Sequence, residues 1–244
     1  MCRRRFPREA APPDILRFAL RFALCGGRRA AGGGRFRAGI FRGVGSITGG
    51  VEKGEGMRLV LASASPRRRE LLKEICPEFD VIPARGEERA DFSRSPGEIV
   101  SALAARKAEE IAALPVAYGA AVLGADTIVY FRGEVLGKPK DAADAGRMLS
   151  LLSGRTHEVF TGVALCMGGG THTAFARTEV TFLPLKKDFI RAYVASGSPM
   201  DKAGAYGIQD GGLVEKISGS YSNVVGLPLE LCGAMLKEFG IIPR

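Results

Sequence analysis

The sequence predicts a mixed α/β domain over residues 57–244, and three observations support this fold class. Strand-like and helix-like apolar patterns alternate along these residues, as they do in α/β folds. Two hairpins are predicted among the strands, which argues against a purely parallel sheet. The chain is 46% hydrophobic and 25% charged, as in an ordinary globular protein. Its apolar runs fall well short of the ~20 residues that span a membrane, so no membrane partner is expected.

The first half of this domain is expected to begin with a buried strand at residues 58–63, which contain the apolar run Leu-Val-Leu-Ala. A helix follows at residues 66–75, with Ser65 as its N-cap and a proline at its first position. Residues 79–83 are expected to form a second short strand. Residues 96–114 place apolar side chains at helical spacing and predict a longer helix.

The second half is expected to begin with a long apolar strand at residues 120–131, turned by an Arg-Gly pair into a partner at residues 134–136. A helix at residues 141–152 ends at a Ser-Gly pair. Three consecutive glycines predict a second hairpin, with strands at residues 158–167 and 171–183. Apolar spacing predicts two more helices, at residues 187–195 and 227–239.

The formal net charge of +9 falls almost entirely on residues 1–56, which carry 12 Lys and Arg against 4 Asp and Glu. Residues 57–244 have a net charge of only +1, so nucleic-acid binding would depend on the extension alone, and no nucleic-acid partner is expected. Three interpretations of this extension stay open. It is a disordered basic arm, a targeting segment, or a segment outside the natural protein, because the codons for residues 51–56 resemble a ribosome-binding sequence ahead of Met57.

The cysteines and histidines carry no predicted site. The five cysteines occur singly, without the paired spacing of a disulfide framework or a zinc site: Cys2, Cys25, Cys76, Cys166 and Cys232. They are typical of reduced thiols in a cytoplasmic protein. His157 and His172 have no cysteine at ligand spacing, so neither is expected to bind zinc or act as a catalytic base.

Two serines and three consecutive arginines follow the first predicted strand. The pattern Ser63-Ala-Ser65-Pro-Arg67-Arg68-Arg leads directly into the predicted helix. Free backbone N–H groups and the helix dipole favour an anion at such an end, and guanidinium groups add bidentate donors. Positive side chains are otherwise unfavourable there, so a bound phosphate would explain them. The alternative, in which the arginines only face water, stays open.

Asp126 is the only ionisable carboxylate in the apolar run at residues 120–131. A charge in such a strand must be paired, bind a metal or lie at a functional site. The alternative is a carboxylate that caps a nearby backbone N–H. Lys138 and Lys202 lie in glycine-containing turns, and each is a weak signal by itself.

Six segments, in this order, resemble the Maf family of nucleoside triphosphate pyrophosphatases. They read LASASPRR at 61–68, GADT at 124–127, GKP at 137–139, SGRTH at 153–157, DKAGAYGIQ at 201–209 and NVVGLP at 223–228. Six ordered segments make coincidence improbable. The resemblance defines residues 57–244 as a Maf-like nucleotide pyrophosphatase domain and leaves the basic extension outside the family pattern.

The resemblance implies an elongated mixed β-sheet with flanking helices and a deep central nucleotide cleft, as in inosine triphosphatase-like folds. It implies hydrolysis of a nucleoside triphosphate to the monophosphate and pyrophosphate, with Mg²⁺ or Mn²⁺ as the divalent metal cation, by a cytoplasmic homodimer. The Gly-Ala-Tyr-Gly-Ile-Gln form at residues 204–209 is similar to the branch that acts on dTTP and UTP. The branch that prefers 7-methyl-GTP tends to lack that Tyr and Gln.

The resemblance also implies roles for individual residues. Asp126 matches the catalytic proton acceptor and would contact the metal, with Glu70 and Glu88 as further metal ligands. The residues implied in substrate selection are Arg67, Thr127 and Gln209. Those implied around the phosphates are Ser65, Arg68, Lys107, Lys138 and Lys202. Two alternatives are kept: a regulatory or binding protein linked to cell-division arrest, and a pyrophosphatase that prefers another modified nucleotide.

Overall fold

The computed structural model describes residues 57–86 and 90–243, so the predictions for residues 1–56 and for Glu88 lie outside the described residues. These residues form a seven-stranded sheet in the order β2-β1-β3-β5-β6-β7, with β4 beside β3. The strands are β1 (Leu59–Leu61), β2 (Asp80–Val81), β3 (Ala121–Phe131), β4 (Glu134–Leu136), β5 (Thr156–Met167), β6 (Gly170–Phe182) and β7 (Val214–Ser218). The helices are α2 (Pro66–Lys73), α3 (Pro96–Ala112), α4 (Ala142–Leu152), α5 (Lys187–Ala195), α6 (Tyr221–Val225) and α7 (Leu229–Glu238).

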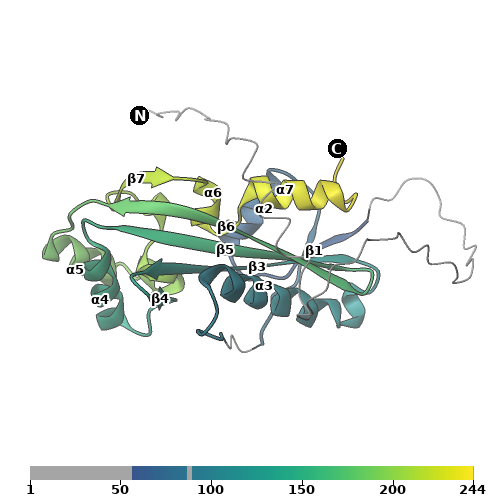
Figure 1. Cartoon of the computed structure of the whole chain (residues 1–244), viewed down its shortest axis with the longest axis horizontal. Helices are drawn as coiled ribbons and strands as arrows, with labels where there is room; N and C mark the ends of the chain where they lie inside the picture. Colours follow the sequence, from purple (N-terminus) through teal and green to yellow (C-terminus); the bar gives the residue numbers. More distant parts are fainter. Residues whose placement is uncertain (1–56, 87–89, 244) are drawn as a thin grey trace, which may run out of the picture.

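The sheet is mixed, as the predicted hairpins require. β1 pairs in parallel with β2 and β3, whereas the pairings of β3 with β4, β3 with β5, β5 with β6 and β6 with β7 are antiparallel. The three long strands β3, β5 and β6 run along the long axis of the molecule and give it an elongated shape (Figure 1). The predicted fold class, an elongated mixed sheet with flanking helices, is therefore confirmed.

Helix α3 covers one face of the sheet at very close range. A Cβ atom added at Gly124 of β3 would lie 2.3 Å from the backbone oxygen of Ala104, and one added at Gly162 of β5 would lie 2.3 Å from that of Val100. Only glycine leaves room for a helix backbone this near to the sheet. The two glycines are register partners of Ala164 and Asp126, so the close approach surrounds Asp126.

The opposite face of the sheet carries two apolar clusters, one toward each end of the long strands. The first joins β1, β3, β5 and β6 to α2 and α7, with Leu61, Leu72 and Leu236 at its centre. The second joins the other ends of β3, β5 and β6 to α4 and α5, with Leu149 and Phe182 fully buried. Figure 1 shows α2 and α7 near one end and α4 and α5 near the other.

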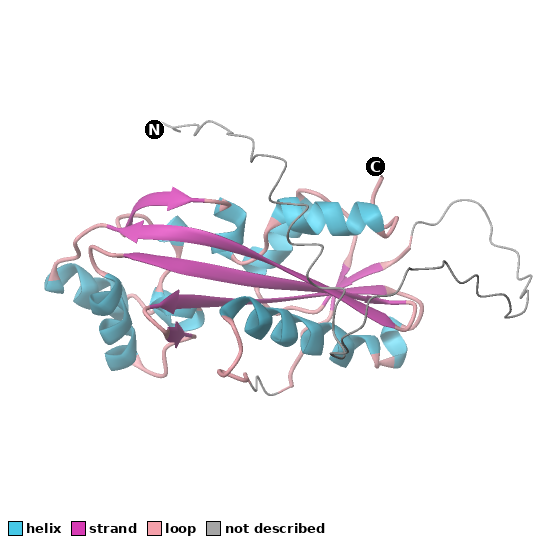
Figure 2. Cartoon of the chain, in the orientation of Figure 1, coloured by secondary structure: helices cyan, strands magenta, loops and turns pink. Residues whose placement is uncertain are grey.

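Besides short 3-10 turns, one strand and one α-helix were not predicted from the sequence, β7 and α6 (Figure 2). β7 is a five-residue edge strand whose side chains are mostly exposed, so it lacks an apolar alternation. α6 has only five residues and is stabilised by its N-cap, where the Ser220 side chain accepts a bond from Asn223 N at 3.3 Å. Elements this short are decided by tertiary contacts and caps, not by periodicity.

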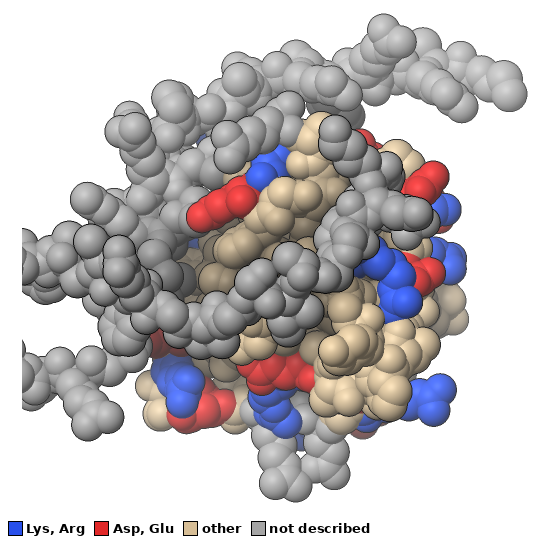
Figure 3. All heavy atoms as spheres, turned by 90° about the vertical axis from the view of Figure 1, so that its right-hand side faces the viewer, with Lys and Arg blue, Asp and Glu red and all other residues tan. Residues whose placement is uncertain are grey.

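Charged side chains of both signs are interspersed on the end of the molecule that faces the viewer in Figure 3. In the described residues, no helix is long and apolar enough to cross a membrane.

Candidate functional site

Strand β3 is left without a strand partner over part of one edge. β1 pairs with Ala121 to Leu123, and β4 pairs with Val129 to Phe131. Among the described strands, none pairs with residues 124–128 on this side, and we call this stretch the open edge. β1 runs parallel to β3 and β4 antiparallel to it, so the segments that follow both strands are directed toward the open edge. The predicted site residues gather around it.

Asp126 lies on the open edge and points toward α3. Its carboxylate Oδ1 lies 2.5 Å from the ammonium nitrogen of Lys107, and the two side chains are 8% and 18% exposed. A carboxylate buried to this degree in an apolar strand needs a cationic partner. The structure thus brings together the predicted proton acceptor and one predicted phosphate-binding lysine.

Ser65 is the N-cap of α2, as predicted. Its side-chain oxygen accepts a bond from Arg68 N, and Pro66 opens the helix. The Ser63 hydroxyl oxygen accepts a bond from Ser65 N at 3.2 Å, and the guanidinium of Arg68 lies 3.5 Å from the same oxygen. The turn after β1 is therefore fixed by its two serines.

Arg68 ties α2 to the open edge instead of facing water. Its Nε donates to the backbone oxygen of Gly226 at 2.7 Å, and its Nη2 donates to the Thr127 hydroxyl at 3.0 Å. Thr127 is the neighbour of Asp126 in β3, so its side chain lies on the opposite face of the sheet. Arg68 thus contacts the open edge on one face of the sheet, and the Asp126 side chain extends from the open edge on the other face.

The Thr127 hydroxyl is the first member of a row of hydrogen-bonded polar side chains, which lies between the two apolar clusters and also contains Thr161, Asn223 and Thr178. It lies 3.0 Å from the Thr161 hydroxyl, which donates to the backbone oxygen of Asn223 at 2.9 Å. The Asn223 amide in turn donates to Val159 O and to Thr178 Oγ1, at 3.1 and 2.9 Å. Thr161, Thr178 and Asn223 are each at most 1% exposed. This row positions Thr127, and sequence reasoning missed Thr161 and assigned no role to Asn223.

Arg67 and Lys202 are brought together by Asp201. Arg67 Nη1 lies 2.9 Å from Asp201 Oδ2, and Lys202 Nζ lies 2.9 Å from Asp201 Oδ1. Burial raises the pKa of Asp201, but the bonds from Lys202 and Arg67 outweigh it and hold that pKa below its usual range. Lys202 Nζ also donates to Ser198 O at 2.5 Å. Asp201 was quoted in a motif but given no role, and its position between two cations 135 residues apart could not be seen in the sequence.

The other predicted site residues have no contact with Asp126 among the bonds and ion pairs of the described residues. Gln209, Lys138 and Glu70 are exposed, and Glu88 lies outside the described residues. Lys138 follows Gly137, whose backbone oxygen accepts a bond from Gly204 N at 3.0 Å. This bond joins the turn after β4 to the segment that carries Lys202 and Gln209.

A separate hollow of about 470 Å³ lies near the hairpin end of β3. Its lining includes Arg132, Arg155, Arg177, Glu158 and Glu179. None of the predicted site residues lines it. Arg177 is already paired with Glu158 and Glu179, so the hollow offers no free cationic centre at that position.

The Maf-like protein family matches residues 58–239 of this chain. The chain belongs to the Maf-like protein family. Proteins called dTTP/UTP pyrophosphatase from Symbiobacterium thermophilum, Bacillus thuringiensis and Bacillus cytotoxicus are 53%, 48% and 49% identical to it. Each alignment covers 75% of this chain and 94%, 96% and 95% of the respective relative. Among solved structures, that of a HAM1 protein from Coxiella burnetii covers 75% of this chain and 99% of its own, with 19% identity and a TM-score of 0.44.

Five of the six Maf-like segments converge in this structure. Three of them meet at the open edge. The segment at 61–68 begins at the end of β1, the segment at 124–127 lies in β3, and the segment at 137–139 follows β4. The segment at 201–209 joins them through Asp201 and Gly204. The segment at 223–228 joins them through the bond from Arg68 to Gly226.

The donor chemistry at the open edge fits a hard divalent cation that is held largely by its substrate. Mg²⁺ and Mn²⁺ prefer oxygen ligands, and Mg²⁺ is commonly bound by one or two carboxylates together with phosphates and waters. Asp126 offers one buried carboxylate there. No group of three or more His, Cys, Asp or Glu side chains that could hold a metal exists within residues 57–86 and 90–243. Asp126 is thus the buried carboxylate of the open edge that could contact such a cation.

Proposed function

We propose that this chain is a nucleoside triphosphate pyrophosphatase that hydrolyses dTTP and UTP to the monophosphate and pyrophosphate. The observation that carries the proposal is the buried Asp126 carboxylate on the open edge, 2.5 Å from the Lys107 ammonium. Relatives about half identical over nearly their whole length are called dTTP/UTP pyrophosphatase, which supports the substrate class. Modified pyrimidine triphosphates belong to the same proposal.

Asp126 is proposed as the proton acceptor. The oxygen of a water adds to the α-phosphorus, its proton passes to the Asp126 carboxylate, and the bond from the α-phosphorus to the bridging oxygen breaks. The electron pair of that bond leaves with pyrophosphate. A general base of this kind contributes ~10²–10⁴ to the rate. Lys107 holds the carboxylate in place through their ion pair.

The cations around the open edge are proposed to bind the triphosphate. Two of these cations, Arg67 and Arg68, lie in α2. Lys138 lies in the turn after β4, and Lys202 lies in the segment that follows α5. Fixed positive groups stabilise the charge that develops on the leaving pyrophosphate. Ser65 adds a hydroxyl at the N-terminus of α2, where anions are favoured. Thr127 and Gln209 are proposed to contribute to pyrimidine selection, since a Gln amide offers both a donor and an acceptor.

A divalent metal cation, Mg²⁺ or Mn²⁺, is part of the proposal. Asp126 would hold it, with Glu70 and Glu88 as further candidates. When bound, such a metal neutralises phosphate charge and makes a bound water more acidic.

A cytoplasmic homodimer is proposed as well. The free cysteines Cys76, Cys166 and Cys232 support a reducing compartment.

The proposal is tested by pyrophosphate release from dTTP, UTP, CTP, GTP and 7-methyl-GTP with Mg²⁺ or Mn²⁺. Wild type is compared with Asp126→Asn and with Asp188→Asn, whose carboxylate lies on the exposed start of α5. We expect turnover of dTTP and UTP, a loss of ~10²–10⁴ in Asp126→Asn and no change in Asp188→Asn. If no nucleotide were turned over, the proposed pyrophosphatase activity would be refuted and the regulatory alternative favoured. If only 7-methyl-GTP were turned over, the assignment of dTTP and UTP as substrates would be refuted.

A further inference from the structure

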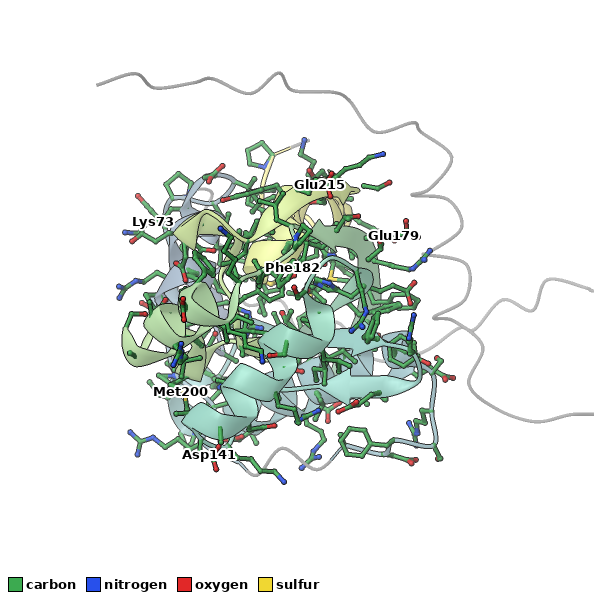
Figure 4. The ribbon with its side chains drawn as sticks, turned by 90° about the vertical axis from the view of Figure 1, so that its left-hand side faces the viewer. Lys73, Asp141, Glu179, Phe182, Met200 and Glu215 are labelled. Carbon is green, nitrogen blue, oxygen red and sulfur yellow. The ribbon has the colours of Figure 1, made fainter. Side chains whose placement is uncertain are left out.

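Tyr206 lies in the middle of the motif at residues 201–209 but turns away from solvent. It is 5% exposed, and its hydroxyl lies 2.8 Å from His157 Nε2. Both rings pack edge-on against Phe182, with centroids 4.7 Å away for Tyr206 and 4.9 Å away for His157. Phe182 is labelled in the interior of the molecule in Figure 4, behind the helices. A nucleotide at the open edge cannot touch the Tyr206 hydroxyl while this cluster is intact.

The hydrogen bond between Tyr206 and His157 is a bond between neutral groups. Burial lowers the pKa of His157 to about 4 and raises that of Tyr206 far above its usual range. The other ring nitrogen of His157 is buried and has no hydrogen-bond partner in the described part of the chain. Tyr206 is therefore the one described hydrogen-bond partner of this ring, and losing its hydroxyl would leave the buried imidazole unsatisfied.

The backbone next to Tyr206 is strained. Gly204 and Ala205 have φ angles of 67° and 59°, in the left-handed region, and Ala205 is one of two non-glycine residues with positive φ in the described chain. Such a conformation persists only where surrounding contacts hold it. Gly204 packs so close to Val129 of β3 that an added Cβ would lie 2.7 Å from Val129 Cγ2. Tyr206, the next residue after Ala205, adds a second buried contact beside this turn.

The strained turn separates Lys202 from Gln209, the two residues of the motif that are proposed to bind substrate. Lys202 and its neighbour Asp201 precede it, and Gln209 follows it. Beyond Tyr206, the backbone N–H of Gly207 donates to the Tyr193 hydroxyl at 3.0 Å, which is a second anchor. Residues 202–209 are thus anchored by Tyr206 inside the motif and Tyr193 outside it, in addition to the bond from Gly204 N to Gly137 O.

We infer that His157 and Tyr206 form a buried positioning pair that holds residues 202–209 against the sheet and thereby sets nucleotide selectivity. Tyr206 acts on the substrate only through the placement of Lys202 and Gln209. The inference rests on the proposed function and deepens it. It also assigns a role to the motif at residues 153–157, which ends in His157 and otherwise has no contact with the open edge among the described bonds.

Tyr206→Phe in the full chain removes one oxygen atom and keeps the ring packing. We expect KM for UTP and dTTP to rise by ~3–10-fold, the range that one hydrogen bond supplies, with kcat changed less than twofold. The preference for UTP over 7-methyl-GTP in kcat/KM should fall. Tyr130→Phe is the matched control, because Tyr130 lies on the other face of β3 beside Phe160. It should leave KM and the preference unchanged.

A double-mutant cycle separates positioning from a general loss of stability. His157→Phe alone should raise KM, and Tyr206→Phe combined with His157→Phe should cost no more than either change alone, because both break the same bond. His157→Gln, which keeps a polar group near the hydroxyl, should restore part of the affinity. Unchanged KM and unchanged selectivity in Tyr206→Phe, with only a lower Tm, would overturn the inference.

Amide hydrogen exchange distinguishes failure of this inference from failure of the proposed function. In Tyr206→Phe, residues 202–209 should exchange faster, while the amides of β3 and β5 keep their protection. This readout needs no substrate. If wild type releases no pyrophosphate, the proposed function fails and the exchange result alone decides the positioning role. Unchanged exchange at residues 202–209 would refute it.

Discussion

The ammonium of Lys107 lies 2.5 Å from the carboxylate of Asp126, across the interface between α3 and the central strand β3. This pair exists because two glycines beside Asp126 let the backbone of α3 approach the sheet. The polar centre of the open edge is therefore a consequence of helix-on-sheet packing. On the other face of the sheet, Arg68 reaches the same stretch of β3 from a different helix, α2, and donates to the Thr127 hydroxyl.

Replacing Lys107 by Met is expected to lower both stability and turnover. The change leaves the Asp126 carboxylate buried without its ammonium partner, which costs about 3 kcal/mol of the free energy of unfolding. Urea unfolding and pyrophosphate release measure the two effects. Asp126→Asn combined with Lys107→Met should be more stable than Lys107→Met alone, since no unpaired charge remains. If Lys107→Met alone were as stable as wild type, the ion pair would be irrelevant to the fold.

Replacing Gly124 by Ala is expected to move α3 away from the sheet. The added Cβ would lie 2.3 Å from Ala104 O, so the helix must shift, and Lys107 shifts with it. We expect a loss of about 1–3 kcal/mol in the free energy of unfolding, together with reduced kcat. Thermal unfolding and steady-state kinetics check both.

Gly146→Ala is the matched control for Gly124→Ala. Gly146 lies within α4, and a Cβ there would meet nothing within 4 Å. Alanine should stabilise this helix by about 1 kcal/mol without changing kcat. A kcat loss of equal size in both variants would show that the effect of Gly124→Ala does not arise from the position of α3.

Replacing Asp201 by Asn is expected to tighten substrate binding. The Asp201 carboxylate occupies Arg67 and Lys202, the two cations proposed to bind phosphate, and it competes with the triphosphate for them. Because Asp201 is 60% exposed, the effect is small, and KM for UTP should fall by ~2–5-fold with kcat nearly unchanged. Steady-state kinetics at low salt measure it. A raised KM would instead show that Asp201 holds the two cations in a productive position.

The stability of the protein is expected to fall between pH 6.5 and about 4 through His157. Its pKa in the folded chain is lowered by burial from 6.5 to about 4, so only the unfolded chain takes up a proton in this window. The free energy of unfolding then falls by ~1.4 kcal/mol per pH unit, or about 3 kcal/mol in all. This contribution is fully present above pH 6.5.

Urea unfolding at several pH values, with His157→Phe as the comparison, isolates this contribution from that of the carboxylates. The difference in stability between wild type and His157→Phe should shrink as the pH falls through the window. A difference that stays constant from pH 7 to pH 4.5 would show that His157 titrates normally.

Local patterns in the sequence were sufficient for most of the fold. The six strands and five helices expected from apolar periodicity all occur, with ends displaced by a few residues at most. The Ser65 cap and the hairpin turn at Gly133 depend on neighbouring residues alone, so they were predictable. β7 and α6 were not, because each is short and is held by contacts with β6 and with the polar row.

In the candidate site, too, only the residues with a local signal in the sequence could be predicted. Asp126 stood out by itself, since a carboxylate in an apolar strand requires a partner or a function. Its partner Lys107 was implied only by resemblance, because a lysine in an amphipathic helix gives no local sign of what it faces. Asp201 between Arg67 and Lys202, and Tyr206 against His157, involve residues 134 and 49 positions apart.

The order and type of the main elements, the family resemblance and the charged centre in β3 could all be recognised from the amino-acid sequence. Periodicity, caps and turn residues act over a few positions and can be recognised there. Three features became visible only in the folded chain: the open edge of β3, the approach of Arg68 and Lys107 to it from opposite faces, and the burial of Tyr206. Those features depend on which distant segments pack together, and that packing is a property of the whole chain.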